Sequence, residues 1–579
     1  MKKIIIYIGL CAGLVTTGCK KMLEEDPKSI LTPDFLRTTV GFQRGLDAAY
    51  AGNRMFWGNQ DLFTMTVIGT DEFKRGIDGN SDINNYSSGY NSGNGSVVAI
   101  WRNCYYFINA CNGIIDFAPD VTGIDDATKS KMVGEAKFLR AQYYFTMVQF
   151  WADVTLNEHF NDQPLTSAKR DPQSKIYDLI VKDLKEAIPV LPPGPKSGGL
   201  LPGKTSAATA KHLLAKVYLT RAGTAVAQAT DYENAYLTAK DMIDNRGSAG
   251  LALLADYKDI HAEGNEGNAE VLWTVQHTSN IPFNGPNNSG GADNVLNHMW
   301  VPQYEKKPGM IRSMNYGRPY IRCTPTLWLV DTCFKEKVND TRYYKSFQIA
   351  WIANDPTPGN YPVWPNPLPP GAPASAVAGQ PRFKLGDTAI YMPGVAKTKA
   401  QVDASPYLLI PLKAPATGYA GYDNTLSPTL IKCFDTKRAD LNDPSVRPVI
   451  VYRFAETYLM AAEAAFRTNR LTEAVDYINA IRERAAFPSG SAVAMRITVA
   501  DLNIDFILDE RARELCGENV RWWDLVRTGK LLERVRLHNV DAQKNILSKH
   551  ILRPIPQAQI DATTTGDQYN FSIYFPGWN

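Results

Sequence analysis

The sequence lacks the features that identify several common protein classes. Its 62 basic and 59 acidic residues nearly cancel, so the positive field that attracts nucleic acid is absent and no nucleic-acid partner is expected. The seven histidines are scattered and no CxxC pair occurs, so no metal site of the usual zinc spacing is predicted. Beyond the N-terminus, no apolar run reaches the roughly 20 residues that a membrane-spanning helix needs.

The cysteines offer no obvious disulfide framework. Cys104 and Cys111 lie seven positions apart on an expected helix, which separates them by about 10 Å along the axis, beyond the ~7 Å limit for a disulfide. We therefore expect both to fill a core face. A disulfide between Cys323 and Cys333 is compatible with the sequence, which does not decide whether it forms. The sequence also leaves open a calcium ion near Asp78 and Asp82, although no EF-hand spacing is present.

The first residues have the pattern of an export signal. Lys2 and Lys3 precede an apolar run of about a dozen residues, followed by small residues up to Cys19, as in a secretory signal. Residues 16–19 look like the box at which bacterial lipoprotein signals are cut. We expect residues 1–18 to be removed and Cys19 to be lipidated, which holds the protein on a membrane. Cleavage nearby by ordinary signal peptidase is the alternative.

Apolar residues at helical spacing predict a mainly α protein. The segment 454–486 consists of one helix, a polar break at 468–470 and a second helix, and small Ala462 and Ala465 in the first helix allow close packing. This hairpin has the build of a tetratricopeptide repeat. Further helices are expected at 39–56, 97–117, 129–151, 174–189, 209–223, 232–244 and 504–518.

Three long stretches have a different composition. Residues 76–96 and 280–320 are rich in Gly, Asn and aromatic residues, and residues 355–373 are rich in proline. Long polar loops in a compact exported protein are typically functional. We expect one domain over 19–579, with a helical scaffold at about 39–245 and 446–540 and a loop-rich, ligand-binding insert at about 246–445.

Several motifs together resemble the SusD/RagB-like lipoproteins of Bacteroidetes outer membranes. These motifs occur in the family's order and extend along nearly the whole chain. They are KKMLEEDP after Cys19, WRNCYYFINACNGII (101–115), EAKFLRAQYYF (135–145), GKTSAATAKHLLAKVYL (203–219), YRFAETYLMAAEA (452–464), DERARELCGENVRWWDLVR (509–527), LRPIPQAQI (552–560) and FPGWN (575–579). The resemblance implies a tetratricopeptide-like fold on the outer face of the outer membrane. It also implies a non-enzymatic lid on a SusC-like TonB-dependent transporter, with oligosaccharide as the usual cargo and peptide in some members.

Two motifs suggest catalysis or nucleotide binding, and each has a simpler interpretation. Residues 198–205 match a P-loop pattern, but the proline-rich stretch before them is unsuited to a core strand and Pro202 removes a donor. We expect Thr205 or Ser206 to cap the next helix, and no cofactor is predicted. Glu510 and Glu514 lie one helical turn apart, near the spacing of a retaining glycosidase pair.

The neighbouring arginines, however, favour two charged carboxylates and hence structural ion pairs. No catalytic residue is therefore predicted. An exported hydrolase that uses either glutamate, and a purely structural scaffold, remain alternatives.

A glycan site needs aromatic faces for the sugar rings and planar polar groups for the hydroxyls. The first candidates are Tyr86, Tyr90 and Asn91, because the family's binding aromatics often precede the 101–115 helix. Asp71 and Arg75 lie at the mouth of that loop, where we expect them to clamp a sugar hydroxyl group. The second loop-rich stretch and its flank supply Trp300, Tyr316 and Trp328.

Overall fold

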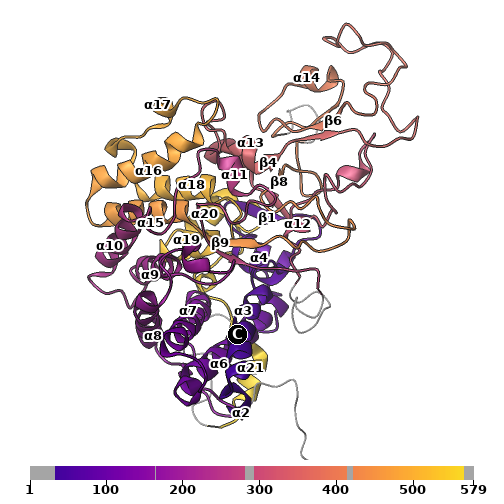
Figure 1. Cartoon of the computed structure of the whole chain (residues 1–579). Coiled ribbons are helices and arrows are strands. Elements are labelled where there is room, and N and C mark those ends of the chain that lie inside the picture. The colour runs from indigo at the N-terminus through magenta and orange to yellow at the C-terminus, as the bar shows by residue number, and fades with distance from the viewer. Residues whose placement is uncertain (1–32, 164, 281–292, 414–420, 566–579) are drawn as a thin grey trace, which may run out of the picture.

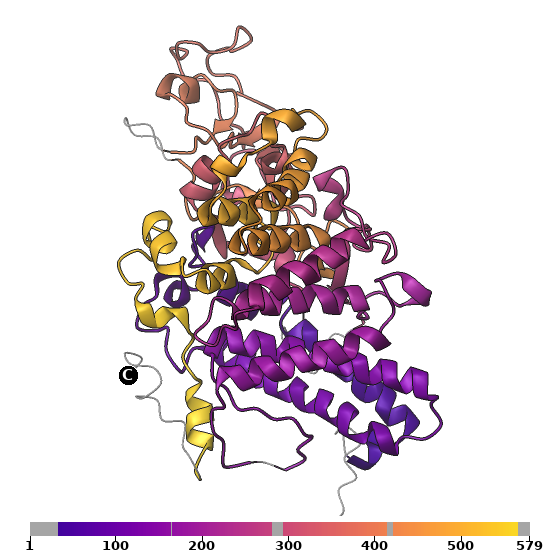
Figure 2. The same cartoon turned by 90° about the vertical axis from the view of Figure 1, so that its left-hand side faces the viewer.

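The computed structural model of the chain describes residues 33–163, 165–280, 293–413 and 421–565. Figures 1 and 2 show a helical body from which a loop-rich lobe projects. The expected lipidation site, Cys19, lies outside the described residues.

The described chain is mainly helical, with short strands. The helices that precede the insert are α2 (Pro33–Leu36), α3 (Thr39–Ala51), α4 (Gln60–Thr66), α5 (Ser81–Asn85), α6 (Gly95–Phe117), α7 (Asp126–Trp151), α8 (Gln173–Ala187), α9 (Ala207–Arg221) and α10 (Asp231–Asp244). The insert contains α11 (Tyr257–Ile260), α12 (Leu296–Met299), α13 (Arg342–Ser346) and α14 (Lys399–Asp403). After it come α15 (Phe454–Arg467), α16 (Leu471–Ala485), α17 (Ala492–Met495), α18 (Ile504–Glu514), α19 (Arg521–Arg527), α20 (Leu531–His538) and α21 (Gln557–Ala562). The strands are β1 (Phe73–Arg75), β2 (Val271–Val275), β3 (Cys323–Pro325), β4 (Phe347–Gln348), β5 (Ala350–Ile352), β6 (Thr388–Tyr391), β7 (Leu408–Leu409), β8 (Thr429–Leu430) and β9 (Val449–Arg453).

The scaffold helices form a continuous array. Each packs on the next in the order α6, α7, α8, α9, α10, α15 and α16, and Figure 2 shows the indigo-to-magenta helices stacked beneath the orange hairpin. Side chains fix where these helices start: Asn94 caps α6, Asp125 caps α7 and Ser206 caps α9, each accepting from a backbone N–H of the first turn. The expected helices are thereby confirmed, as is capping by Ser206.

The α15–α16 hairpin shows why the sequence specifies close packing. Ala462 and Ala465 are fully buried on α15, so their short side chains let neighbouring helices approach. Asn469 adopts a left-handed conformation at φ 60° in the connection, which ends α15 and reverses the chain. The break predicted at 468–470 is therefore confirmed.

The insert begins and ends on the scaffold. Strand β2, in the first part of the insert, pairs antiparallel with β9, which directly follows the insert, so this part of the insert lies beside the scaffold segment. Within the insert, β5, β6 and β7 form a three-stranded sheet. A small core of its own forms around Trp351, Ile390 and Met392. Figure 1 shows this part, with β6 and α14, at the end of the molecule remote from α2 and α21.

Candidate functional site

Tyr86 and Tyr90 lie in the core, not on an exposed shelf as the sequence suggested. Their exposed fractions are 4% and 1%, and the two rings pack on His550 at centroid distances of 4.9 and 6.0 Å. The Tyr86 hydroxyl donates to Gly69 O at 2.8 Å, and Arg553 donates to the Tyr90 hydroxyl. The C-terminal segment therefore covers both rings, which argues against their contact with a ligand in this conformation.

Asp71 and Trp328 are also structural in this conformation. The Asp71 carboxylate is fully buried and accepts from Arg521 at 2.7 and 2.6 Å and from Arg534 at 2.7 Å. Burial opposes its ionisation, but these two arginines hold the pKa of Asp71 well below its usual value. The Trp328 ring stacks on His538 at 4.9 Å and lies beneath Arg534. The expected hydroxyl clamp at Asp71 is thus occupied by intramolecular ion pairs.

Trp300 and Asn91 do not come together with the other candidates. Trp300 is 3% exposed and packs edge-on against Phe63 and Phe73, so it belongs to the main core. Asn91 is exposed, and its side chain accepts from Gly93 N and donates to Ser88 O. Its amide therefore stabilises a turn.

Arg75 and Tyr316, the two remaining candidates, belong to segments 75–78 and 316–322, which contact each other through Gly76 N–H to Arg322 O and Asp78 N–H to Ile321 O. Strand β1 pairs with β3 so that Arg75 lies opposite Cys323. Two residues further on, Ile77 donates its N–H to Asn424 O at 2.8 Å. Tyr316, half-buried, contacts Tyr304 and accepts from Ile352 N at 2.7 Å. We call the surface formed by segments 75–78, 316–322 and 424 the loop junction.

Sequence analysis missed Tyr320 at this junction. Its half-exposed ring lies beneath the guanidinium groups of Arg318 and Arg322, at 5.0 and 5.6 Å, and against His298. Arg322 also holds segment 75–78 through a bond to Asp78 O. The available signal was the alternation of tyrosine and arginine in the 316–322 stretch.

The insert contains a hollow next to the loop junction, which we call the insert cleft. Its volume is about 400 Å³, within the range of ordinary ligand pockets. Segment 421–426 contributes to both sites. The cleft is lined by Lys307, Pro308, Pro362, Arg382, Phe383, Val402, Asp403, Tyr407, Leu408, Leu409, Ile410, Gly421, Asp423 and Leu426.

The insert cleft combines an apolar floor with polar groups. Phe383 and Ile410 are buried in the insert core beneath it. Tyr407 is half-exposed and packs edge-on against Tyr391 at 5.8 Å. Arg382 lies over Trp364 at 4.8 Å and donates to Ser405 O, which fixes its guanidinium. The site thus presents an aromatic ring beside a held planar cation.

Asp423 and Lys307 add opposite charges to the same cleft. Burial raises the pKa of Asp423, but hydrogen bonds from Thr425, one from its hydroxyl at 2.7 Å, outweigh burial and lower this pKa, with Lys307 contributing. The carboxylate is therefore ionised at neutral pH and available to accept from a hydroxyl group. In the sequence, only the composition of the loops indicated a ligand-binding region here.

Comparison with known proteins decides the family. The model of the SusD family matches residues 255–578, more than half of the chain. The chain belongs to the SusD family. A second model, described as starch-binding associating with outer membrane, matches residues 23–219. The predicted SusD-like, mainly α fold is confirmed.

Relatives of this SusD family member cover more than nine tenths of its length. SusD-like protein P2 of Formosa agariphila is 26% identical, over 97% of each chain. A laminarin binding SusD-like protein of known structure has a TM-score of 0.60 at 22% identity, covering 92% of this chain and 100% of its own. The surface glycan-binding protein A of Bacteroides thetaiotaomicron, solved with laminarihexaose, has a TM-score of 0.63 at 20% identity, covering 91% and 98%.

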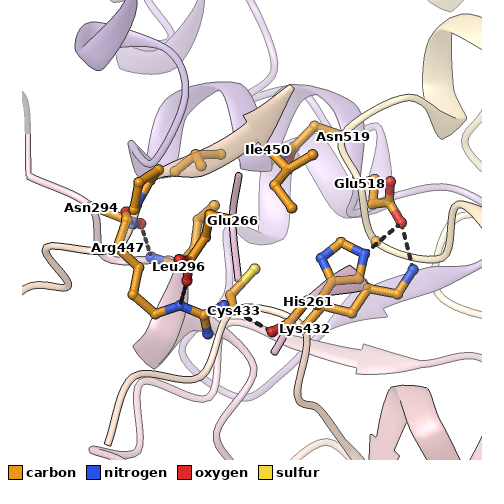
Figure 3. Close-up of a pocket in the computed structure, with 13 residues that line it drawn as sticks. His261, Glu266, Asn294, Leu296, Lys432, Cys433, Arg447, Ile450, Glu518 and Asn519 are labelled. Atoms are coloured by element: carbon orange, nitrogen blue, oxygen red, sulfur yellow. Dashed lines mark hydrogen bonds and ion pairs between the residues drawn. The ribbon is translucent and has the colours of Figure 1, made fainter. Parts of the chain in front are cut away.

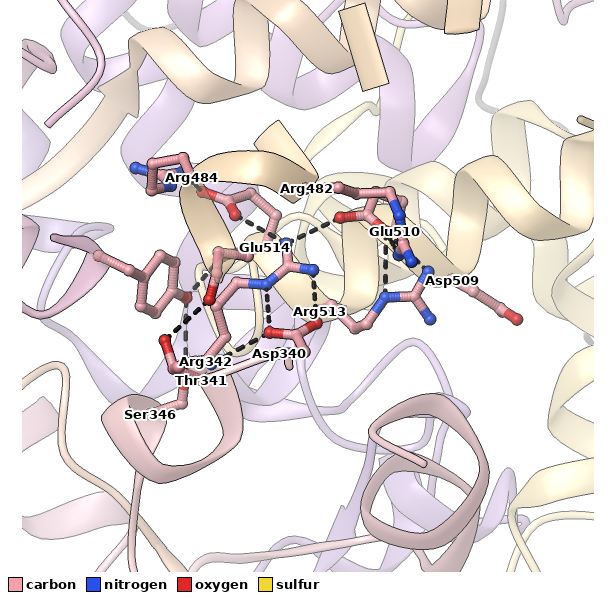
Figure 4. Close-up of polar contacts among 12 residues, drawn as sticks. Asp340, Thr341, Arg342, Ser346, Arg482, Arg484, Asp509, Glu510, Arg513 and Glu514 are labelled. Atoms are coloured by element: carbon pink, nitrogen blue, oxygen red, sulfur yellow. Dashed lines mark hydrogen bonds and ion pairs between the residues drawn. The ribbon is translucent and has the colours of Figure 1, made fainter. Parts of the chain in front are cut away.

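In this SusD family chain, Glu510 and Glu514 form ion pairs and do not line a cleft. Both carboxylates are fully buried, and Arg342 bridges them at 2.8 and 2.9 Å (Figure 4). Burial raises the pKa of each carboxyl, but the surrounding arginines outweigh burial, bringing the pKa of Glu514 to about 2 and that of Glu510 well below its usual value. Neither can serve as a protonated general acid near neutral pH. The prediction of structural ion pairing is confirmed.

The P-loop-like segment is likewise structural. The Lys204 ammonium lies 3.4 Å from Glu135, 3.6 Å from Asp47 and over the ring of Tyr50. Thr205 is buried, and its N–H donates to the Tyr50 hydroxyl at 3.1 Å. Lys204 is thus engaged by carboxylates in the place where a phosphate would require a free cation.

A cavity at the base of the insert, shown in Figure 3, is too small for a sugar. It encloses about 50 Å³ beside His261, Cys433 and Glu518, room for only a few water molecules. Lys432 donates to Glu518 at 2.6 Å, and Arg447 donates to Glu266 at 2.5 Å. These charges stabilise the joint between insert and scaffold.

The described part of the chain contains no membrane-spanning helix and no metal-binding cluster. No helix there is sufficiently long and apolar to span a bilayer, and no group of three or more His, Cys, Asp or Glu residues there is arranged to hold a metal ion. Cys104 and Cys111 are fully buried, as predicted. Cys323 and Cys333 are buried free thiols, which answers the pairing question left open above for this structure.

Proposed function

We propose that this protein binds an oligosaccharide in the insert cleft, beside the loop junction, without altering it. The observation that carries the proposal is the cleft itself: a half-exposed Tyr407 ring, a fixed Arg382 guanidinium and an ionised Asp423 around about 400 Å³. Sugar rings stack on aromatic faces, and their hydroxyls bond to planar and charged side chains. The structural relatives that bind laminarin and laminarihexaose support this ligand class.

Arg75 and Tyr316 extend the proposed site across the loop junction. Segment 75–78 joins the two sites, because Gly76 donates its N–H to Arg322 O and Ile77 donates its N–H to Asn424 O, in the segment 421–426 that contributes to the cleft. A chain of several sugars can therefore contact both surfaces. This extended surface suits weak binding, in the micromolar to millimolar range, of order −4 to −8 kcal/mol.

Calorimetry with a panel of ligands tests the ligand class. We expect laminarihexaose or maltohexaose, but not an oligopeptide of similar length, to bind the mature protein and to be recovered uncleaved. Binding of peptide alone would replace the proposal with the peptide-uptake alternative, and cleavage of the oligosaccharide would establish a hydrolase.

Substitutions then locate the site. Tyr407→Ala with Lys307→Ala removes the ring and a cleft cation, and we expect affinity to fall about tenfold, equivalent to about 1.4 kcal/mol. The matched control is Lys306→Ala, because Lys306 is the exposed neighbour of Lys307 in the chain and does not line the cleft. Full affinity in the double variant would contradict the proposed location.

We also propose that Cys19 carries lipid and tethers the protein at the outer membrane, facing outward, where it acts as a lid on a SusC-like TonB-dependent transporter. The signal-like residues 1–18, the family and the outer-membrane description of the second family model support this. Cys19→Ala is expected to abolish metabolic labelling with palmitate and to release the protein from membranes. Continued labelling would refute the anchor, and failure of wild type to copurify with any TonB-dependent transporter would refute the lid.

A further inference from the structure

A second groove, which we call the α6 groove, lies at the other end of the molecule. Its volume is about 380 Å³, similar to that of the insert cleft. Helices α6 and α21 lie at the end that also holds α2, whereas β6 and α14 of the insert lie at the far end (Figure 1). The α6 groove is lined by Val98, Trp101, Arg102, Tyr105, Thr155, Asn157, Asn161, Leu165, Ser167, Ala168, Pro556, Ala558 and Gln559.

The aromatic side of the α6 groove is held rigidly. Trp101 packs edge-on against Tyr105 at 5.2 Å and against Trp151 at 5.0 Å. Its indole N–H donates to Gln559 Oε1 at 3.1 Å, and the Tyr105 hydroxyl donates to Thr155 O at 3.1 Å. Three separate chain segments therefore fix these rings. Trp101 is only 3% exposed and packs against Tyr105, so the half-exposed Tyr105 ring is the aromatic face that a ligand would meet, already held in place.

The polar side of the groove retains hydrogen-bonding capacity. Asn157 donates its backbone N–H to the Tyr144 hydroxyl, and its backbone carbonyl accepts from the Asn112 side chain. Within the described ranges its side-chain amide has no hydrogen-bond partner. Arg102 is exposed, and in the same ranges its guanidinium has one hydrogen-bond partner: Nε donates to Asn103 Oδ1 at 3.4 Å. A planar amide and a planar cation thus remain available beside the rings.

We infer that the α6 groove is a second carbohydrate-binding site. This inference rests on the proposed function and extends it to a separate surface. A fixed aromatic ring with uncommitted planar donors and acceptors matches the chemistry of a sugar, whereas a purely apolar ligand would leave Arg102 and Asn157 without partners on desolvation. With sites at opposite ends, a long polysaccharide can bind through two of its stretches and gain avidity over a hexasaccharide.

Tryptophan residues provide a separate reporter for each site. Trp101 lies in the α6 groove, and Trp364 lies beneath Arg382 of the insert cleft. We propose ¹⁹F NMR of the mature protein labelled with 5-fluorotryptophan, with the two resonances assigned from Trp101→Phe and Trp364→Phe. Titration with laminarihexaose is expected to shift both resonances, each with its own saturation curve.

Substitutions separate this inference from the proposed function. Arg102→Ala with Asn157→Ala is expected to weaken the Trp101 response at least tenfold and to leave the Trp364 response unchanged. Arg44→Ala, at an exposed position of α3, is the control and should change neither the Trp101 nor the Trp364 response. If only Trp364 responds in wild type, the α6 groove is no carbohydrate site although the proposed function holds. If oligopeptide instead of hexasaccharide shifts Trp101, the inferred ligand class is wrong, and if neither resonance responds to sugar, both proposals fail.

Discussion

Glu514→Gln is expected to lower the free energy of unfolding by about 3–5 kcal/mol, the cost of breaking a buried ion pair. The Glu514 carboxylate is fully buried and accepts from Arg453 at 2.6 Å, Arg484 at 2.5 Å and Arg342 at 2.9 Å. These arginines come from the end of β9, from α16 and from α13. Glutamine retains the shape but not the charge, so three guanidinium groups lose a shared counter-ion away from water.

Urea unfolding followed by circular dichroism measures this loss. The control is Glu483→Gln, which removes the surface pair with Arg496, whose side chain is 61% exposed. Such exposed pairs contribute about 0–1 kcal/mol, so the control should unfold near the wild-type midpoint. Equal midpoints for the Glu514 variant and wild type would contradict the structural role of the network.

Acidification is expected to destabilise the protein in two steps, the first from buried histidines. Burial lowers the pKa of His261 to about 4 and, with Arg438 adding to the effect, that of His298 to about 4. The unfolded chain protonates these groups near pH 6.5, whereas the folded chain resists protonation until about pH 4. Stability is therefore complete above pH 6.5 and is lost as the pH falls from 6.5 toward 4. For His261 alone, a shift of this size corresponds to about 3 kcal/mol.

The second step comes from the carboxylates. Burial opposes ionisation of Glu514, but Arg484, Arg453 and Arg342 lower its pKa to about 2. Its contribution is therefore present above pH 4.5 and is lost as the pH falls from 4.5 through 2. Urea midpoints measured from pH 8 to 3 should decline in both windows, and His261→Gln should reduce the slope between pH 6.5 and 4. A midpoint that stays constant from pH 7.5 to 4.5 would refute the first step.

The helical scaffold was predictable because its pattern is local. In helices α15 and α16, apolar residues recur at the helical period, and the break at 468–470 lies between these two helices. The structural role of Glu510 and Glu514 also followed from local sequence, because arginines flank both on α18. The sequence could not specify which distant arginines complete the network, such as Arg342 from the insert.

Prediction failed where contacts between distant segments determine burial. Tyr86 and Tyr90 stand in a Gly- and Asn-rich loop, a composition typical of surface, yet His550 and Arg553 cover them from more than 400 residues away. The insert cleft was missed for the same reason, because Lys307, Tyr407 and Asp423 meet only after the insert folds. Composition indicated loop-rich stretches but not the side chains that line the cleft.

A crystal structure of the mature protein soaked with laminarihexaose tests the central claim most directly. We predict sugar density in the insert cleft, with one ring against Tyr407 and hydroxyl groups within hydrogen-bond distance of Arg382 or Asp423. An empty insert cleft in a crystal where the same hexasaccharide is well ordered elsewhere on the protein would contradict the proposed site.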